Sequence, residues 1–74
     1  MTKLYYTIEK QTEPFDDTEV CTGWKNIQVY EIANDQPKLW FELEIENEES
    51  SLKSIQSWLN DNGFGKRNYE FVWL

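Results

Sequence analysis

A change of hydrophobic period in the middle of the chain constrains the fold more than any other feature of the sequence. Residues 38–46, KLWFELEIE, carry leucine, phenylalanine and isoleucine at alternate positions, which is the period of a β-strand with one buried face. After residue 47 the apolar side chains recur at helical spacing, with Leu52, Ile55 and Leu59 in one stripe. The sequence therefore predicts a strand followed closely by an amphipathic helix.

Three other segments have the pattern of strands. Residues 3–10 alternate, residues 24–33 are rich in β-branched and aromatic side chains, and residues 69–74 end the chain with aromatic residues at alternate positions. Residues 11–23 contain proline, glycine and an Asp-Asp pair, so a long loop is expected there. The predicted order of elements is β-β-β-α-β.

The length of 74 residues fits a single domain, residues 1–74, near the lower limit of what folds alone. Four Trp, four Tyr and four Phe supply the bulk that so small a core requires. We expect an α+β fold in which a mostly antiparallel four-stranded sheet carries one helix packed on one face. Since one helix covers only one face, the other face should be open.

The hairpin that turns at NDQP, residues 34–37, decides which face Trp40 occupies. A three-residue loop places Val29 opposite Phe41, an apolar pair suited to the core, and Tyr30 opposite Trp40 on the other face. A loop of even length would reverse the faces and expose Val29 beside glutamates. The odd loop is therefore favoured, and Trp40 is expected on the open face.

Two sets of residues follow from this register. The expected covered face consists of Leu4, Tyr6, Ile8, Ile27, Val29, Phe41, Leu43, Ile45 and Phe71. The expected open face shows Tyr5, Tyr30, Trp40, Glu42, Glu44 and Glu46, with Glu9 and Glu70 nearby. Exposed aromatic residues flanked by charge are typical of protein-binding surfaces. The candidate partner-binding residues are Tyr30, Trp40, Glu42, Glu44 and Glu46.

Two alternatives for the open face remain. The polar residues could serve only to solvate it, with Trp40 lying over Tyr30 to stabilise the hairpin. The face could also be buried in a homodimer.

The formal net charge of −7 argues against direct binding to nucleic acid or to an anionic membrane, because both require a basic surface. The acidic residues could instead imitate nucleic acid. Alternate residues of a strand lie about 6.6–6.8 Å apart, whereas one DNA strand carries a charge every 3.4 Å or so. The row of Glu42, Glu44 and Glu46 supplies about half that density. Mimicry of nucleic acid is therefore an alternative function.

Catalytic motifs are not found in the sequence. The chain has no histidine, which excludes Ser-His-Asp and Cys-His catalysis and any imidazole metal site. We therefore expect no enzymatic activity, no cofactor and no metal. The loops at residues 13–19 and 63–68 contain acidic and Gly-Lys-Arg stretches respectively, and they leave a small ligand- or metal-binding protein as a further alternative.

The single cysteine, Cys21, cannot form an internal disulfide, which favours a reducing compartment. The longest apolar run, residues 71–74, is far shorter than the roughly 20 residues of a membrane span. A cytoplasmic location is expected. The function expected from the sequence is a small acidic interaction module (an inhibitor, adaptor or regulatory subunit) that binds a protein partner with a basic surface through the open face.

Overall fold

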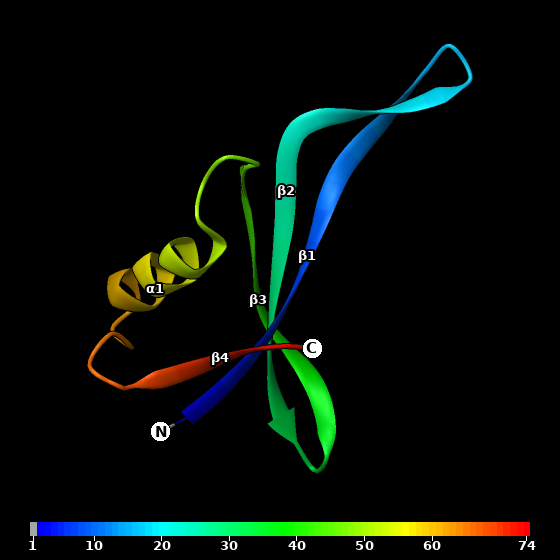
Figure 1. Ribbon diagram of the computed structural model, residues 1–74. Coiled ribbons are helices and arrows are strands. Elements are labelled where there is room, and N and C mark those ends of the chain that lie inside the picture. Colours follow the sequence, from blue (N-terminus) through cyan, green and yellow to red (C-terminus); the bar gives the residue numbers. More distant parts are fainter. Residues whose placement is uncertain (1) are drawn as a thin grey trace.

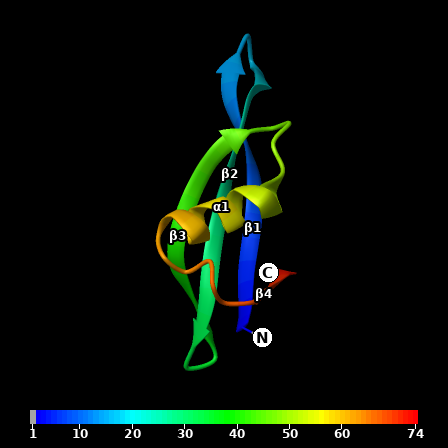
Figure 2. The same cartoon turned by 90° about the vertical axis from the view of Figure 1, so that its left-hand side faces the viewer.

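The computed structural model describes residues 2–74 and shows a four-stranded sheet with one helix against it (Figure 1). The elements are β1 (Thr2–Phe15), β2 (Thr18–Ala33), β3 (Gln36–Glu46), α1 (Ser51–Asp61) and β4 (Tyr69–Trp73). The predicted order β-β-β-α-β and the α+β class are confirmed. Figure 2 shows α1 lying across one face of the sheet, as the sequence predicts.

The strand order in the sheet is β3-β2-β1-β4. The pairs β1–β2 and β2–β3 are antiparallel, whereas β4 runs parallel to β1. The sheet is therefore mixed. The parallel pair follows from the connection, because α1 crosses the sheet between β3 at one edge and β4 at the other, and the chain re-enters in its original direction.

Both ends of α1 have residue types that are common at helix ends. The Ser50 side chain accepts a hydrogen bond from the backbone N–H of Lys53, and the chain leaves the helix through Gly63, whose φ is +84°. Ile55 and Leu59 are fully buried, while Leu52, predicted in the same stripe, remains 43% exposed. The apolar stripe that packs on the sheet is therefore narrower than the sequence pattern indicates.

The core lies between α1 and the sheet. Its buried residues are Leu4, Ile27, Val29, Phe41, Ile45, Ile55 and Leu59. Partly buried residues pack around them, among them Tyr6, Ile8, Leu43 and Phe71. Every residue expected on the covered face thus belongs to the core or packs against it.

The prediction of a long loop at residues 11–23 is wrong. β1 and β2 continue past the sheet and pair with each other as a two-stranded arm, residues 12–21, which projects from the rest of the molecule (Figure 1). Asp16 and Asp17 form its turn with φ of +47° and +65°, a two-residue turn that suits the twist of a hairpin. Because neither face of the arm is covered, its sequence lacks the alternation that marks a half-buried strand.

Within residues 2–74, α1 is too short and too polar to cross a membrane.

Candidate protein-binding surface

The turn between β2 and β3 differs from the predicted one. It contains two residues, Asn34 and Asp35, with φ of +52° and +63°, and Ala33 pairs with Gln36. The prediction of a three-residue loop is therefore wrong. Positive φ at both positions is the geometry of the turn that best matches the twist of antiparallel strands, and Asn and Asp tolerate it better than most residues.

A β-bulge in β3 restores the predicted register farther along the hairpin. Tyr30 pairs with Leu39 and Val29 pairs with Phe41, which leaves Trp40 as an extra residue in β3. The even turn and the bulge each shift the pairing by one residue, so their effects cancel. The predicted pairs Val29–Phe41 and Ile27–Leu43 consequently occur.

Trp40 does not lie on the open face, defined here as the face of the sheet opposite α1. Its ring centroid lies 5.6 Å from that of Trp58 and 5.1 Å from that of Phe64, both in edge-to-face contact. Phe41, the next residue, stacks on Trp58 with a centroid distance of 3.6 Å. At a bulge two consecutive residues oppose one residue of the partner strand, and here both turn toward α1. The expected position of Trp40 is therefore wrong.

Leu39 takes the place on the open face that the sequence assigns to Trp40. It pairs with Tyr30 and is 45% exposed, and the neighbouring Ile32 is 44% exposed. Residues paired directly across strands share a face, so the register also brings Tyr5 and Val72 to this region. The apolar patch consists of Tyr5, Tyr30, Ile32, Leu39 and Val72. Leu39 was missed because the bulge in β3 places it here, whereas Ile32 shares the face of Tyr30 by simple alternation along β2 and was left out of the expected set.

The glutamates lie where the sequence places them. Glu42, Glu44 and Glu46, called the acidic row, are exposed, and the first two pair with Gln28 and Asn26. Glu46 pairs with Trp24, whose side chain is 40% exposed. The tryptophan beside the carboxylates is therefore Trp24 rather than Trp40.

A hydrogen-bond network holds the middle of the open face in one arrangement. Gln28 Oε1 accepts hydrogen bonds from Thr7 Oγ1 at 3.2 Å and from the Tyr30 hydroxyl at 2.9 Å. Gln11 Nε2 donates to Asn26 Oδ1 at 2.9 Å and to Glu44 Oε2 at 3.0 Å. The ring of Tyr30 and the carboxylate of Glu44 are thereby positioned before any partner arrives.

The arm offers further exposed apolar side chains. Phe15 is 64% exposed and Val20 is 40% exposed, and the register places both on the same face of the arm. The exposed thiol of Cys21 lies opposite Thr12. Because the sequence predicts a loop here, it does not indicate that Phe15 and Val20 share a face.

The two loops considered for a ligand have different surroundings. Asp16 and Asp17 sit at the tip of the arm, and among residues 2–74 no group of three or more metal-ligating side chains lies together. In the loop at residues 63–68, Arg67 lines a hollow of about 290 Å³ together with Trp40 and Tyr69. The 63–68 loop thus borders a small aromatic hollow, while the acidic stretch at 13–19 does not form a chelating loop.

Comparison with known proteins gives no assignment: no family model, no curated protein and no solved structure matches this chain.

Proposed function

We propose that this protein is a non-enzymatic interaction module, acting as an inhibitor, adaptor or regulatory subunit, that binds a protein partner through its open face. The observation that carries the proposal is the bulge in β3, which exposes Leu39 beside Tyr30 on the same face as the acidic row. Apolar side chains next to an ordered row of charges are what a specific, desolvating contact requires.

The two parts of the surface have separate tasks. The apolar patch supplies contact area, with the ring of Tyr30 and the side chain of Leu39 as its centre. The acidic row steers a basic partner and orients it, because long-range attraction raises the association rate. The Gln28 and Gln11 hydrogen bonds reduce the conformational entropy that binding costs.

The apolar patch also distinguishes the proposal from its alternatives. A phosphate backbone offers only charge and sugar, so a mimic of nucleic acid has no use for Leu39 and Ile32 beside its carboxylates. A second copy of this chain would bring its own acidic row and a net charge of −7 to the interface, which disfavours a homodimer through this face.

The proposal is tested by capturing partners with variants of the purified chain. Leu39→Ser should abolish capture of a specific partner, while Val20→Ser, at a similarly exposed position on the arm, should retain it. With that partner purified, we expect Leu39→Ser to weaken binding at least about tenfold by calorimetry, as for a residue at the centre of an interface.

A second pair of variants tests the acidic row. Reversing the charge of Glu42, Glu44 and Glu46 to Lys should slow association and remove most of its salt dependence. Reversing the charge of three other exposed residues, Glu13, Glu19 and Glu48, should leave the association rate and its salt dependence largely unchanged. If every partner survives both Leu39→Ser and the reversed acidic row, the open face is not the binding surface. Competition by nucleic acid for the captured partner, with Leu39→Ser harmless, would favour mimicry instead.

A further inference from the structure

β3 forms an edge of the sheet, with β2 as its only neighbour among the described strands. The backbone N–H of Asn47 donates to Gly23 O on the β2 side, whereas the N–H of Glu46 donates to the Glu49 carboxylate at 2.9 Å. Because backbone groups alternate in direction along a strand, Glu42 and Glu44 present theirs outward in the same way as Glu46. At Glu46 both backbone groups are already paired with Glu49, because the Glu49 N–H also donates to Glu46 O at 3.0 Å. The outward groups of Glu42 and Glu44 are therefore the part of the edge that is available to another strand.

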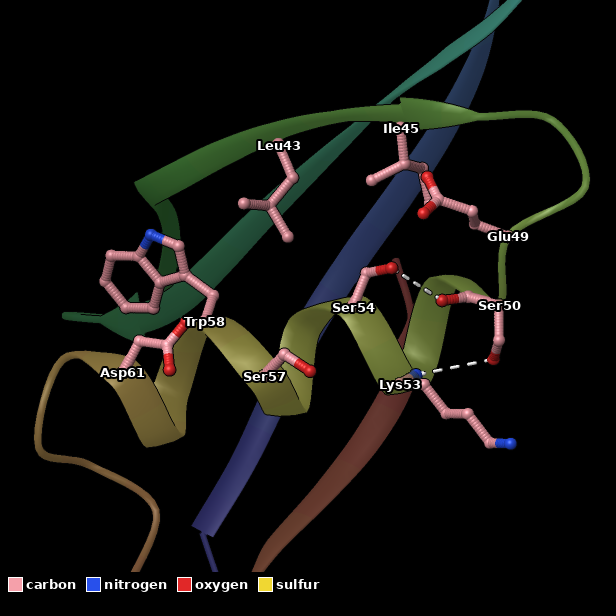
Figure 3. A pocket seen from close by; sticks show the side chains of 9 residues that line it. All are labelled: Leu43, Ile45, Glu49, Ser50, Lys53, Ser54, Ser57, Trp58 and Asp61. Carbon is pink, nitrogen blue, oxygen red and sulfur yellow. Dashed lines mark hydrogen bonds between the residues drawn. The ribbon is translucent and has the colours of Figure 1, made fainter.

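A groove runs between this edge and α1 (Figure 3). Its volume is about 470 Å³. Leu43 and Ile45 point from β3 toward the helix, and Trp58 stands at one end of the groove (Figure 3). Serines line the opposite side: Ser54 and Ser57 of α1, and Ser50, which caps the helix. The groove thus has an apolar floor and a hydroxyl-lined wall beside an open strand edge.

The charges around the edge are mainly negative. Glu49 and Asp61 line the groove, with Lys53 as its one basic lining residue. On the other face of the same strand, Glu42 and Glu44 are exposed. A strand laid along this edge therefore passes between carboxylates on both faces, which favours basic side chains in the incoming segment.

We propose that β3 takes up an extended peptide segment with alternating apolar and basic residues, which adds to the sheet as a fifth strand. The inference rests on the proposed protein-binding function and specifies how the partner engages. Successive side chains of a strand point to opposite faces. The apolar set enters the groove against Leu43, Ile45 and Trp58, and the basic set lies on the open face beside Glu42 and Glu44. Backbone hydrogen bonds to the edge provide affinity, and the alternation provides specificity.

The edge also discriminates against other occupants. Pro37 and Lys38 stand at the start of β3, where they hinder pairing, whereas residues 41–46 contain neither proline nor lysine. A second β3 would place its own glutamates beside Glu42 and Glu44, where like charges directly opposite one another are destabilising. Self-pairing through this edge is thus opposed by the same carboxylates that favour a basic peptide.

The probe for the test is the peptide acetyl-Lys-Leu-Lys-Val-Lys-Leu-Lys-amide. We expect saturable binding by calorimetry with a dissociation constant below about 1 mM, and chemical-shift changes at the amides of residues 42–46 and at the Trp58 indole. A peptide of the same composition without the alternation should bind at least about tenfold more weakly, because its side chains cannot sort to the two faces. Absence of saturable binding by the alternating probe would overturn the inference.

N-methylated probes distinguish strand addition from simple charge attraction. One peptide is methylated at the backbone amide nitrogens of its lysines, and the other at the backbone amide nitrogens of its leucines and valine. The two peptides have the same charge. If the peptide pairs antiparallel to β3, the backbone N–H groups of its lysines face β3. If it pairs parallel, the N–H groups of its leucines and valine face β3. In either case one methylated peptide should lose binding and the other should keep it. If both methylated peptides bind as well as the parent, no strand is added.

Variants of the protein test the groove and the charge separately. Ser57→Trp should fill the groove and lower the affinity for the parent peptide at least about tenfold. Ser57→Ala should leave this affinity unchanged. Glu44→Lys should lower the affinity for the parent peptide about tenfold. Glu70→Lys, on the opposite edge strand β4, should have little effect on this affinity. Circular dichroism of each variant confirms that it is folded.

The two proposals can fail independently. Leu39→Ser removes an open-face contact but leaves residues 42–46 intact, so peptide affinity should stay unchanged. A partner lost with Leu39→Ser but kept with Ser57→Trp would support the open face and reject strand addition for that partner. Peptide binding abolished by Ser57→Trp with no partner sensitive to Leu39→Ser would reject the open-face proposal instead.

Discussion

Trp40 and Leu39 are adjacent in the sequence, and a single backbone irregularity decides which of them meets solvent. The bulge in β3 turns Trp40 toward Trp58 and Phe64 and leaves Leu39 opposite Tyr30 on the other face. The indole is the larger side chain, so placing it against α1 buries more apolar surface than placing Leu39 there would. The exposed leucine is the consequence, and it supplies the centre of the proposed binding surface.

This placement predicts that Trp40 and Trp24 contribute differently to the stability of the fold. Trp40→Ala should lower the free energy of unfolding by about 2 kcal/mol or more, because it leaves a void between α1 and β3. Trp24→Ala, at a residue 40% exposed on the open face, should change it by only about 0.5 kcal/mol. Urea denaturation followed by far-UV circular dichroism measures both. Equal losses, or a greater loss for Trp24→Ala, would contradict the assigned faces.

At the scale of the elements, both hairpins close with two residues of positive φ, at Asp16–Asp17 and at Asn34–Asp35. Asn and Asp at these positions can be recognised in the sequence, but the loop length cannot, because NDQP accommodates either two or three residues. The helix was easier to predict, because the recurrence of Leu52, Ile55 and Leu59 depends only on neighbouring residues.

The turn between β2 and β3 yields a prediction at this scale. Asp35→Gly should raise the free energy of unfolding by about 0.5 kcal/mol, since Asn-Gly is the preferred pair for this turn. Asp35→Ala should lower it by about 1 kcal/mol, because alanine has a larger cost at positive φ. Thermal unfolding of the two variants beside the wild type gives the comparison. A stabilising alanine would mean that the turn does not have this geometry in solution.

The molecule as a whole is elongated, with principal extents of 47 × 27 × 16 Å. The arm accounts for much of the length, and all of its residues from 12 to 21 are exposed. The core lies apart from the arm, between α1 and the sheet (Figure 1). No residue of the arm belongs to the core, so we expect the core to fold without the arm.

Removing the arm tests this division. Replacing residues 12–21 by Asn-Gly should leave a cooperatively folded protein whose melting temperature lies within about 5 °C of the wild type, because no core residue is lost. The amide shifts of Ile27, Phe41 and Ile55 should be unchanged in nuclear magnetic resonance spectra. Loss of cooperative unfolding would show that the arm supports the sheet.

Local patterns in the sequence were sufficient to identify the four strands, the helix, the covered face and the positions of Glu42, Glu44 and Glu46. Each of these depends on the hydrophobic period within a few residues. The arm, the parallel pairing of β4 and the bulge at Trp40 were decided by tertiary structure. The arm has no covered face and therefore no hydrophobic period. The pairing of β4 with β1 depends on how α1 crosses the sheet. The bulge is favoured by contacts of Trp40 with Trp58 and Phe64, which are remote in the chain.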